Sequence, residues 1–220
     1  MKLIFSVIVA LFIISYPNLV HPESKYSKSN AVVKKHHQIS RNSAVKIFTK
    51  TGHGSGSYIK LYKKSYIITA KHVVKNSLIV AVKAGKEVVV GEVVFKLKKQ
   101  DIALIKIPKL KFKNPVELID LASNSLKISE EIVYSGYPSF YNMLTTGGQI
   151  AGERKGNIIL QGLAWPGSSG SGAIGKKGKI VGVITAIGKG KKQLIETIVW
   201  MEPIRKNFWK EVNGFLKPSH

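Results

Sequence analysis

The 220-residue sequence contains no cysteine, twelve acidic residues and, among its 35 basic residues, only three arginines. Without cysteine the chain can form neither a disulfide nor a thiolate metal site, and cysteine usage reveals nothing of its redox compartment. The few carboxylates are not clustered as in a calcium loop, and His36-His37 has no neighbouring ligands. The sequence therefore predicts no metal site and no cofactor.

Long apolar runs are missing except at the N-terminus, where residues 3–14 read LIFSVIVALFII after Lys2. Twelve residues are too few to span a bilayer, which needs about 20. Residues 1–20 are typical of a signal peptide, which would make the protein secreted or periplasmic, and an uncleaved membrane anchor is the alternative. Residues 21–42 are polar and basic without apolar period, so we expect a flexible tether before a domain at 43–212 and a tail at 213–220.

The formal charge of +23 invites a polyanion-binding interpretation, because a basic excess steers a protein toward nucleic acid or anionic membrane. All basic residues except Arg41, Arg154 and Arg205 are lysines, whereas readers of bases and phosphates favour the planar arginine fork. The lysines also recur in short pairs along the whole chain. This distribution indicates a dispersed, solvated surface, and we expect no nucleic-acid partner.

Short β-rich runs separated by Gly, Asn or Lys turns follow one another from Ser43 onward. Six runs precede a looser segment at 108–130 and six follow it, and only residues 203–212 have helical period. The predicted strands cover 44–49, 57–61, 65–69, 78–82, 87–95 and 102–107, and then 132–135, 144–153, 157–163, 172–174, 180–187 and 194–200. The pattern predicts an all-β fold of two six-stranded antiparallel β-barrels, about 43–110 and 131–200, with a C-terminal helix.

Candidate chemistry gathers in three places. The stretch WPGSSGSGAIG, residues 165–175, places serines among glycines that allow a tight turn and free amide N–H groups. A serine nucleophile needs a histidine base, which in turn needs a carboxylate to fix its tautomer. Only His53 and His72 lie inside the expected domain, His53 in a glycine turn and His72 at a strand end. The chain has two aspartates, and Asp101 opens a predicted strand.

Together the motifs TAKHVV, QDIALIKI and GSSGSG occur in the order His, Asp, Ser and resemble the trypsin-like, chymotrypsin-fold serine proteases, above all their HtrA/Deg branch. Residues 54–59, GSGSYI, are similar to the strand ahead of the histidine in that branch. The resemblance implies two barrels with the active site between them, and a protein or peptide as substrate. Because only eight residues follow Val212, we expect none of the PDZ domains common in that branch.

Carried over position by position, the resemblance implies His72 as general base, Asp101 as its orienting carboxylate and Ser169 as nucleophile. It implies an oxyanion hole formed by the N–H groups of Gly167 and Ser169. No acid stands in residues 160–165, where relatives that cleave after Arg or Lys carry one. A substrate pocket is expected from three uncharged residues of this region and of the following strand, namely Leu163, Val183 and Thr185.

These expectations describe a serine endopeptidase that acts through an acyl-enzyme and cleaves after uncharged or aliphatic residues. Two alternatives remain open at this stage. One is a catalytically silent protease-like fold that acts as a binding module, and the other is a basic polyanion-binding protein.

Overall fold

The computed structural model describes residues 26–120, 126–139, 141–189 and 193–216. Within them, twelve strands, two α-helices and one 3-10 helix follow one another along the chain. The order is α1 (Tyr26–Ser43), β1 (Ala44–Thr49), β2 (Gly52–Leu61), β3 (Lys64–Ala70), η1 (Lys71–Val74), β4 (Ile79–Ala84), β5 (Glu87–Lys96), β6 (Ile102–Lys106), β7 (Glu131–Gly136), β8 (Leu144–Arg154), β9 (Asn157–Gly162), β10 (Gly172–Ile174), β11 (Ile180–Lys189), β12 (Leu194–Pro203) and α2 (Lys206–Leu216).

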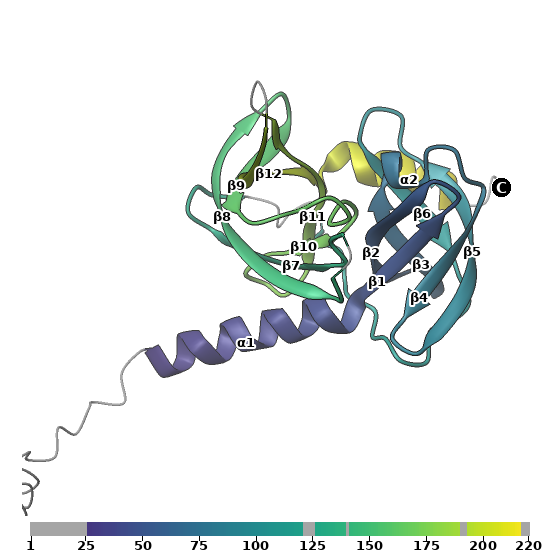
Figure 1. The fold of residues 1–220 in the computed structure, drawn as a ribbon, viewed down its shortest axis with the longest axis horizontal. Coiled ribbons are helices and arrows are strands. Elements are labelled where there is room, and N and C mark those ends of the chain that lie inside the picture. The colour runs from purple at the N-terminus through teal and green to yellow at the C-terminus, as the bar shows by residue number, and fades with distance from the viewer. Residues whose placement is uncertain (1–25, 121–125, 140, 190–192, 217–220) are drawn as a thin grey trace, which may run out of the picture. The chain divides into compact units, whose positions relative to one another are not determined.

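The strands form two closed antiparallel barrels of six strands each (Figure 1). Barrel one has the strand order β1-β2-β3-β6-β5-β4 and closes through pairing of β1 with β4. Barrel two has the order β10-β11-β12-β9-β8-β7 and closes through pairing of β10 with β7. These strand orders confirm the predicted fold class. The sequence could predict it because alternating apolar side chains and frequent turn residues mark the strands of such barrels.

Each barrel buries its own inward-facing side chains. In barrel one, Val45, Ile47, Ile67 and Ile105 are completely buried, as alternation along paired strands requires. In barrel two the buried side chains include Ile132, Leu160, Val183, Val199 and Met201. Burial of such apolar area is the main stabilising contribution in a chain without disulfides.

Helix α2 joins the end of barrel two to barrel one. Phe208 and Val212 are fully buried on its inner face. Its Glu211 carboxylate accepts the backbone N–H of Lys98 in barrel one at 2.8 Å, and the Trp209 indole donates to the carbonyl of Ile119 at 3.2 Å. The predicted C-terminal helix is present, begins three residues later than expected and continues to Leu216.

Two segments differ from the sequence-based expectation. Residues 26–43 form helix α1 instead of an irregular tether, and the last turn of α1 packs by Ile39 and Ser40 rather than through a repeating apolar stripe. Strand β2 begins at Gly52, five residues early, because the glycine-rich stretch pairs with β1 from Thr49 to Ala44.

The expected signal peptide, residues 1–20, lies outside the described residues. Among the helices described, none is long and apolar enough to cross a membrane.

Candidate active site

His72 and Asp101 form a close pair at one end of barrel one. Strand β3 delivers His72 into the short η1 helix, and the turn between β5 and β6 carries Asp101. The Asp101 carboxylate accepts the backbone N–H of His72 at 2.9 Å through Oδ1, and its Oδ2 lies 2.6 Å from His72 Nδ1. Because an ionised carboxylate only accepts hydrogen bonds, this contact favours the neutral tautomer in which Nδ1 carries the proton and Nε2 has a lone pair. This arrangement suits His72 to act as a base.

The three serines in the loop between β9 and β10 differ in burial and in hydrogen bonding. Ser168 and Ser171 are buried, and the Ser171 hydroxyl donates to the carbonyl of Ser168 at 2.8 Å. Ser169 is only half-buried, and its hydroxyl donates to the carbonyl of Thr185 at 3.1 Å. Ser169 is therefore the serine of this loop that a substrate can reach.

Two amide groups of the same loop are free. The N–H groups of Ser168 and Gly170 donate to the carbonyls of Trp165 and Ile184, at 2.9 Å and 2.7 Å. Within the part of the chain that the structure describes, the N–H groups of Gly167 and Ser169 make no hydrogen bond. Gly167 has φ +95°, a conformation that favours glycine. The two unpaired amides are those that the sequence predicts for an oxyanion hole.

Ser55 of β2 holds this loop against barrel one. Its hydroxyl donates to the carbonyl of Gly167 at 2.7 Å and accepts the backbone N–H of Tyr137 at 2.8 Å. Its own N–H donates to the carbonyl of Ser169 at 2.8 Å. A side chain at Gly170, where φ is +96°, would collide with the Ser55 carbonyl. The loop can therefore lie this close to β2 only with glycine at that position.

The turn that carries Asp101 is fastened to barrel two. The Gln100 side-chain amide, which is buried, donates to the Glu202 carboxylate at 3.1 Å and to the carbonyl of Pro203 at 2.9 Å. Burial raises the pKa of Glu202, and the nearby Asp101 charge raises this pKa further, while hydrogen bonds from Gln100 and from the Asp101 backbone partly offset both effects. Gln100 opens the motif QDIALIKI, but the sequence assigned no role to it, and no motif includes Glu202.

His53, the second histidine of the folded region, does not join the pair. It lies in β2 opposite Phe48 rather than in a turn, and its Nε2 is 3.1 Å from the carbonyl of Tyr137. It is nevertheless close to the serine loop, because a Cβ at Gly167 would lie 2.9 Å from that nitrogen. Among the residues described, no cluster of three His, Cys, Asp or Glu side chains could hold a metal ion.

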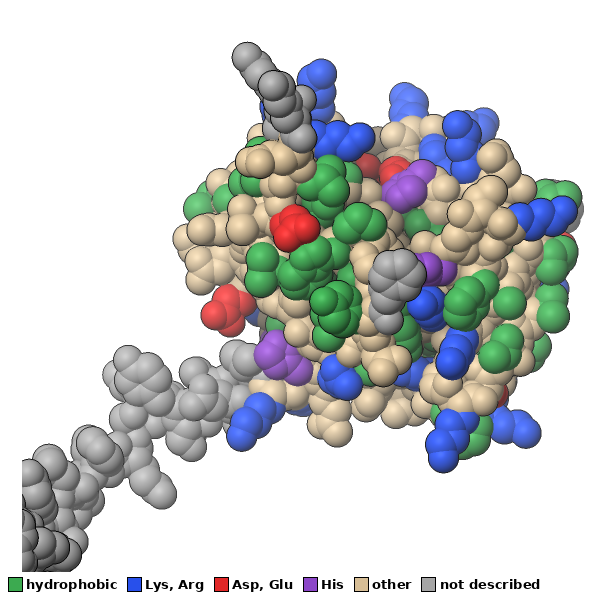
Figure 2. Space-filling model, viewed as in Figure 1, with side chains coloured by type: hydrophobic (Ala, Val, Ile, Leu, Met, Phe, Trp, Pro, Cys, Tyr) green, Lys and Arg blue, Asp and Glu red, His purple; other side chains and the backbone are tan. Residues whose placement is uncertain are grey.

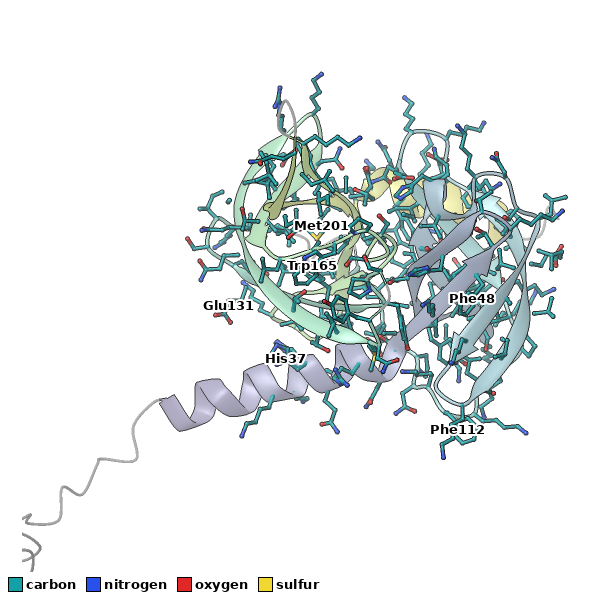
Figure 3. All side chains as sticks on the ribbon, viewed as in Figure 1. His37, Phe48, Phe112, Glu131, Trp165 and Met201 are labelled. Atoms are coloured by element: carbon teal, nitrogen blue, oxygen red, sulfur yellow. The ribbon has the colours of Figure 1, made fainter. Side chains whose placement is uncertain are left out.

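A cavity of about 240 Å³ opens beside Ser169. Its lining is mainly apolar and contains Ala164, Trp165, Pro166, Ser168, Ser169, Ile184, Ala186, Ile187, Lys189 and Leu194. The Trp165 indole donates to the Glu196 carboxylate at 3.0 Å beside it, and Figure 3 shows Trp165 on the side of barrel two that faces barrel one.

The residues predicted for the pocket, Leu163, Val183 and Thr185, are not among those that line this cavity. In each case a sequence neighbour lines it instead. Val183 is buried in the barrel interior, and Leu163 is 44% exposed. Side chains alternate along a strand, so an error of one position reverses the face, and β11 also has a register shift between Ile184 and Ala186.

A family model for the trypsin-like peptidase domain matches residues 54–183, which is more than half of the chain and includes His72, Asp101 and Ser169. No curated protein matches the sequence significantly.

Solved structures share the fold. The Rv3671c protease in an inactive form has a TM-score of 0.67 and 20% identity, over 88% of this chain and 97% of that chain. An inactive serine-to-alanine mutant of Rv3671c from M. tuberculosis has a TM-score of 0.65 and 20% identity, over 90% and 97%. The serine endoprotease from Yersinia pestis has a TM-score of 0.65 and 18% identity, over 77% and 61%. The chain belongs to the trypsin-like peptidase domain family and has the double-barrel fold of these serine proteases.

Proposed function

We propose that this protein is a serine endopeptidase that uses Ser169 as nucleophile, His72 as general base and acid, and Asp101 as the carboxylate that orients His72. The observation that carries the proposal is the pairing of His72 Nδ1 with Asp101 at 2.6 Å, which leaves Nε2 available as a proton acceptor. The accessible Ser169 hydroxyl and the unpaired amides of Gly167 and Ser169 support it.

In the proposed reaction, the Ser169 hydroxyl turns from the Thr185 carbonyl toward His72 when a substrate binds. His72 Nε2 takes the hydroxyl proton while Oγ attacks the peptide carbonyl, and the free N–H groups of Gly167 and Ser169 stabilise the oxyanion. The imidazolium then gives the proton to the leaving amine. Water hydrolyses the acyl-enzyme by the same route, with His72 again acting first as base and then as acid.

We further propose cleavage after uncharged residues of small or medium size. The cavity beside Ser169 has a volume of about 240 Å³, and no Asp or Glu occurs among the described residues that line it. A lysine or arginine side chain would therefore lose its hydration there without a carboxylate partner, which is costly. An aliphatic side chain has no charged group to desolvate in the cavity, and burial of its apolar surface there is favourable.

The proposal is tested by labelling the protein with a fluorophosphonate probe and locating the site by peptide mass. Wild type should be labelled at Ser169, and Ser169→Ala and His72→Ala should not be labelled. Ser171→Ala, which removes a buried hydroxyl of the same loop, is the matched control and should still react at Ser169. A folded wild type that resists the probe would contradict the proposal and would favour a silent binding module, in which the Ser169 hydroxyl stays on the Thr185 carbonyl.

A further inference from the structure

A second cavity, of about 420 Å³, lies where α1, β1 and β4 meet the segment between β7 and β8. Three cations line it, Arg41, Lys46 and Lys83, together with the aromatic residues Phe48, Tyr137 and Tyr141. We call it the Arg41 cavity. Figure 2 shows Lys and Arg side chains below the centre of the visible face, and Figure 3 shows Phe48 on barrel one.

The positive charge of this cavity has no internal partner. No Asp or Glu occurs among the described residues that line it, and the ion pairs found in the described ranges involve none of its three cations. The Arg41 guanidinium donates to the Thr145 hydroxyl at 3.0 Å, and Lys46 Nζ lies 5.3 Å from the centre of the Phe48 ring. These neutral contacts orient the cations without neutralising them, so the cavity favours an anionic ligand.

The effect of Arg41 extends to neighbouring groups. Lys113 Nζ donates to the Arg41 carbonyl at 2.8 Å, and the pKa of Lys113 is lowered by burial and by the Arg41 charge. Burial raises the pKa of the Tyr137 hydroxyl, and the Arg41 charge opposes that rise. An anion beside Arg41 would relieve the repulsion that Lys113 experiences.

Tyr137 connects the Arg41 cavity to the serine loop. Its side chain belongs to the cavity lining, its N–H donates to Ser55, and Ser55 donates to Gly167. The Tyr137 carbonyl is so close to Gly167 that a Cβ on that glycine would lie 2.6 Å away. The Arg41 cavity therefore adjoins the serine loop at Gly167, two positions before Ser169 in the sequence.

The apolar cavity and the Arg41 cavity meet the serine loop at different residues and share none of their lining. The apolar cavity contacts the loop at Ser168 and Ser169, whereas the Arg41 cavity approaches it at Gly167 through Tyr137. We infer from this that a peptide whose acyl-side residue fills the apolar cavity extends its leaving-group side past Ser169 toward Arg41. An extended peptide advances roughly 3.3 Å per residue, so a cavity that adjoins the serine loop is one that residues soon after the scissile bond could occupy.

We propose that the Arg41 cavity binds an acidic side chain of the substrate on the leaving-group side of the scissile bond, so that the protease selects acidic segments there. The inference rests on the proposed function. One charge-assisted hydrogen bond from Arg41 to a carboxylate is enough for a preference of about tenfold in kcat/KM for Glu over Gln. Because the cavity is open to solvent ions, this preference falls as ionic strength rises.

The test uses matched peptides that share the acyl side and carry Glu, Gln or Lys at the second, third or fourth position after the scissile bond. Wild type should cleave the best Glu peptide about tenfold faster in kcat/KM than its Gln counterpart, with Lys slowest. Arg41→Gln should reduce the Glu rate to the Gln rate. Arg154→Gln removes an equally charged, exposed arginine at the end of β8 and should keep the wild-type preference.

Binding to the Ser169→Ala protein, measured by fluorescence anisotropy with the same peptides, separates this inference from the proposed catalysis. Tighter binding of the Glu peptide that Arg41→Gln abolishes supports the cavity even in a protein that cannot cleave. Equal binding and equal cleavage of Glu and Gln peptides would overturn the inference, as would a preference that survives Arg41→Gln. Binding of heparin that depends on Arg41, without any Glu preference, would also overturn it and would indicate a polyanion site.

Discussion

Replacing Ser55 by alanine should reduce kcat strongly, although Ser55 is not one of the proposed catalytic residues. The Ser55 side chain is fully buried and bonds both the Gly167 carbonyl and the Tyr137 N–H. Alanine leaves these two part-buried groups without this partner. Each such group costs about 1 to 3 kcal/mol, so the free energy of unfolding should fall by roughly 2 to 6 kcal/mol.

The effect on catalysis follows from the position of Gly167. Its N–H is one of the two amides proposed for the oxyanion hole, and its φ of +95° leaves the backbone free to rotate once the Gly167 carbonyl is released. Loss of one oxyanion donor lowers kcat by about 10²- to 10³-fold, and a donor that is misplaced rather than removed should cost about 10- to 100-fold. KM should change little, because the apolar cavity contains neither Ser55 nor Gly167.

Ser57→Ala is the matched control for this prediction. Ser57 lies two residues further along β2, is equally buried, and accepts the Gly172 N–H at 3.0 Å rather than contacting Gly167. It should lose roughly 1 to 3 kcal/mol of stability and keep most of its kcat. Urea unfolding and steady-state cleavage of one peptide measure both quantities. A Ser55→Ala protein whose kcat stays within about threefold of the Ser57→Ala protein would refute the reasoning from oxyanion geometry.

Two further changes test the surroundings of the site. Burial raises the pKa of Glu202, so the folded protein binds the carboxyl proton of Glu202 more tightly than the unfolded chain does. The stability that this protonation contributes is lost as pH rises from the ordinary pKa of 4.5 through the raised pKa. Glu202→Gln should therefore gain stability relative to wild type with rising pH, and a difference in urea midpoints that is constant with pH would contradict this. Ala186→Ile should fill the mouth of the apolar cavity and lower kcat/KM for leucine substrates at least about tenfold relative to alanine substrates, and an unchanged ratio would exclude Ala186 from the pocket.

The sequence was informative about the barrels because the alternation of buried and exposed side chains is visible within each strand by itself. Alternating apolar residues and turn residues located twelve strands, and the order of His72, Asp101 and Ser169 indicated the candidate site. Strand β2 was placed too late because its first residues are glycine and serine, which carry no apolar pattern. They form a strand because Gly54 and Gly56 leave room for Val73 and Ile67.

The sequence did not predict helix α1, and the residues predicted for the pocket do not line the cavity beside Ser169, for a different reason. The last turn of α1 packs through Ile39 and two buried serines, so the packing leaves no repeating apolar signature. The pocket depends on which face of β11 a residue occupies, and the register shift near Ile184 changes that face. Both depend on contacts between segments that are distant in sequence, and local pattern does not record them.

The side chains that position the candidate site bond mainly to backbone groups of distant segments, and this explains why sequence motifs could indicate the candidate residues but not the roles of their supports. Ser55, on barrel one, contacts carbonyls of Gly167 and Ser169 on barrel two, while Glu202, on barrel two, contacts the turn that carries Asp101 on barrel one. Each barrel thus contacts the segment of the other that carries candidate site residues. It follows that a change which loosens the contact between the barrels should lower kcat before it unfolds either barrel, because catalysis depends on geometry that neither barrel fixes alone.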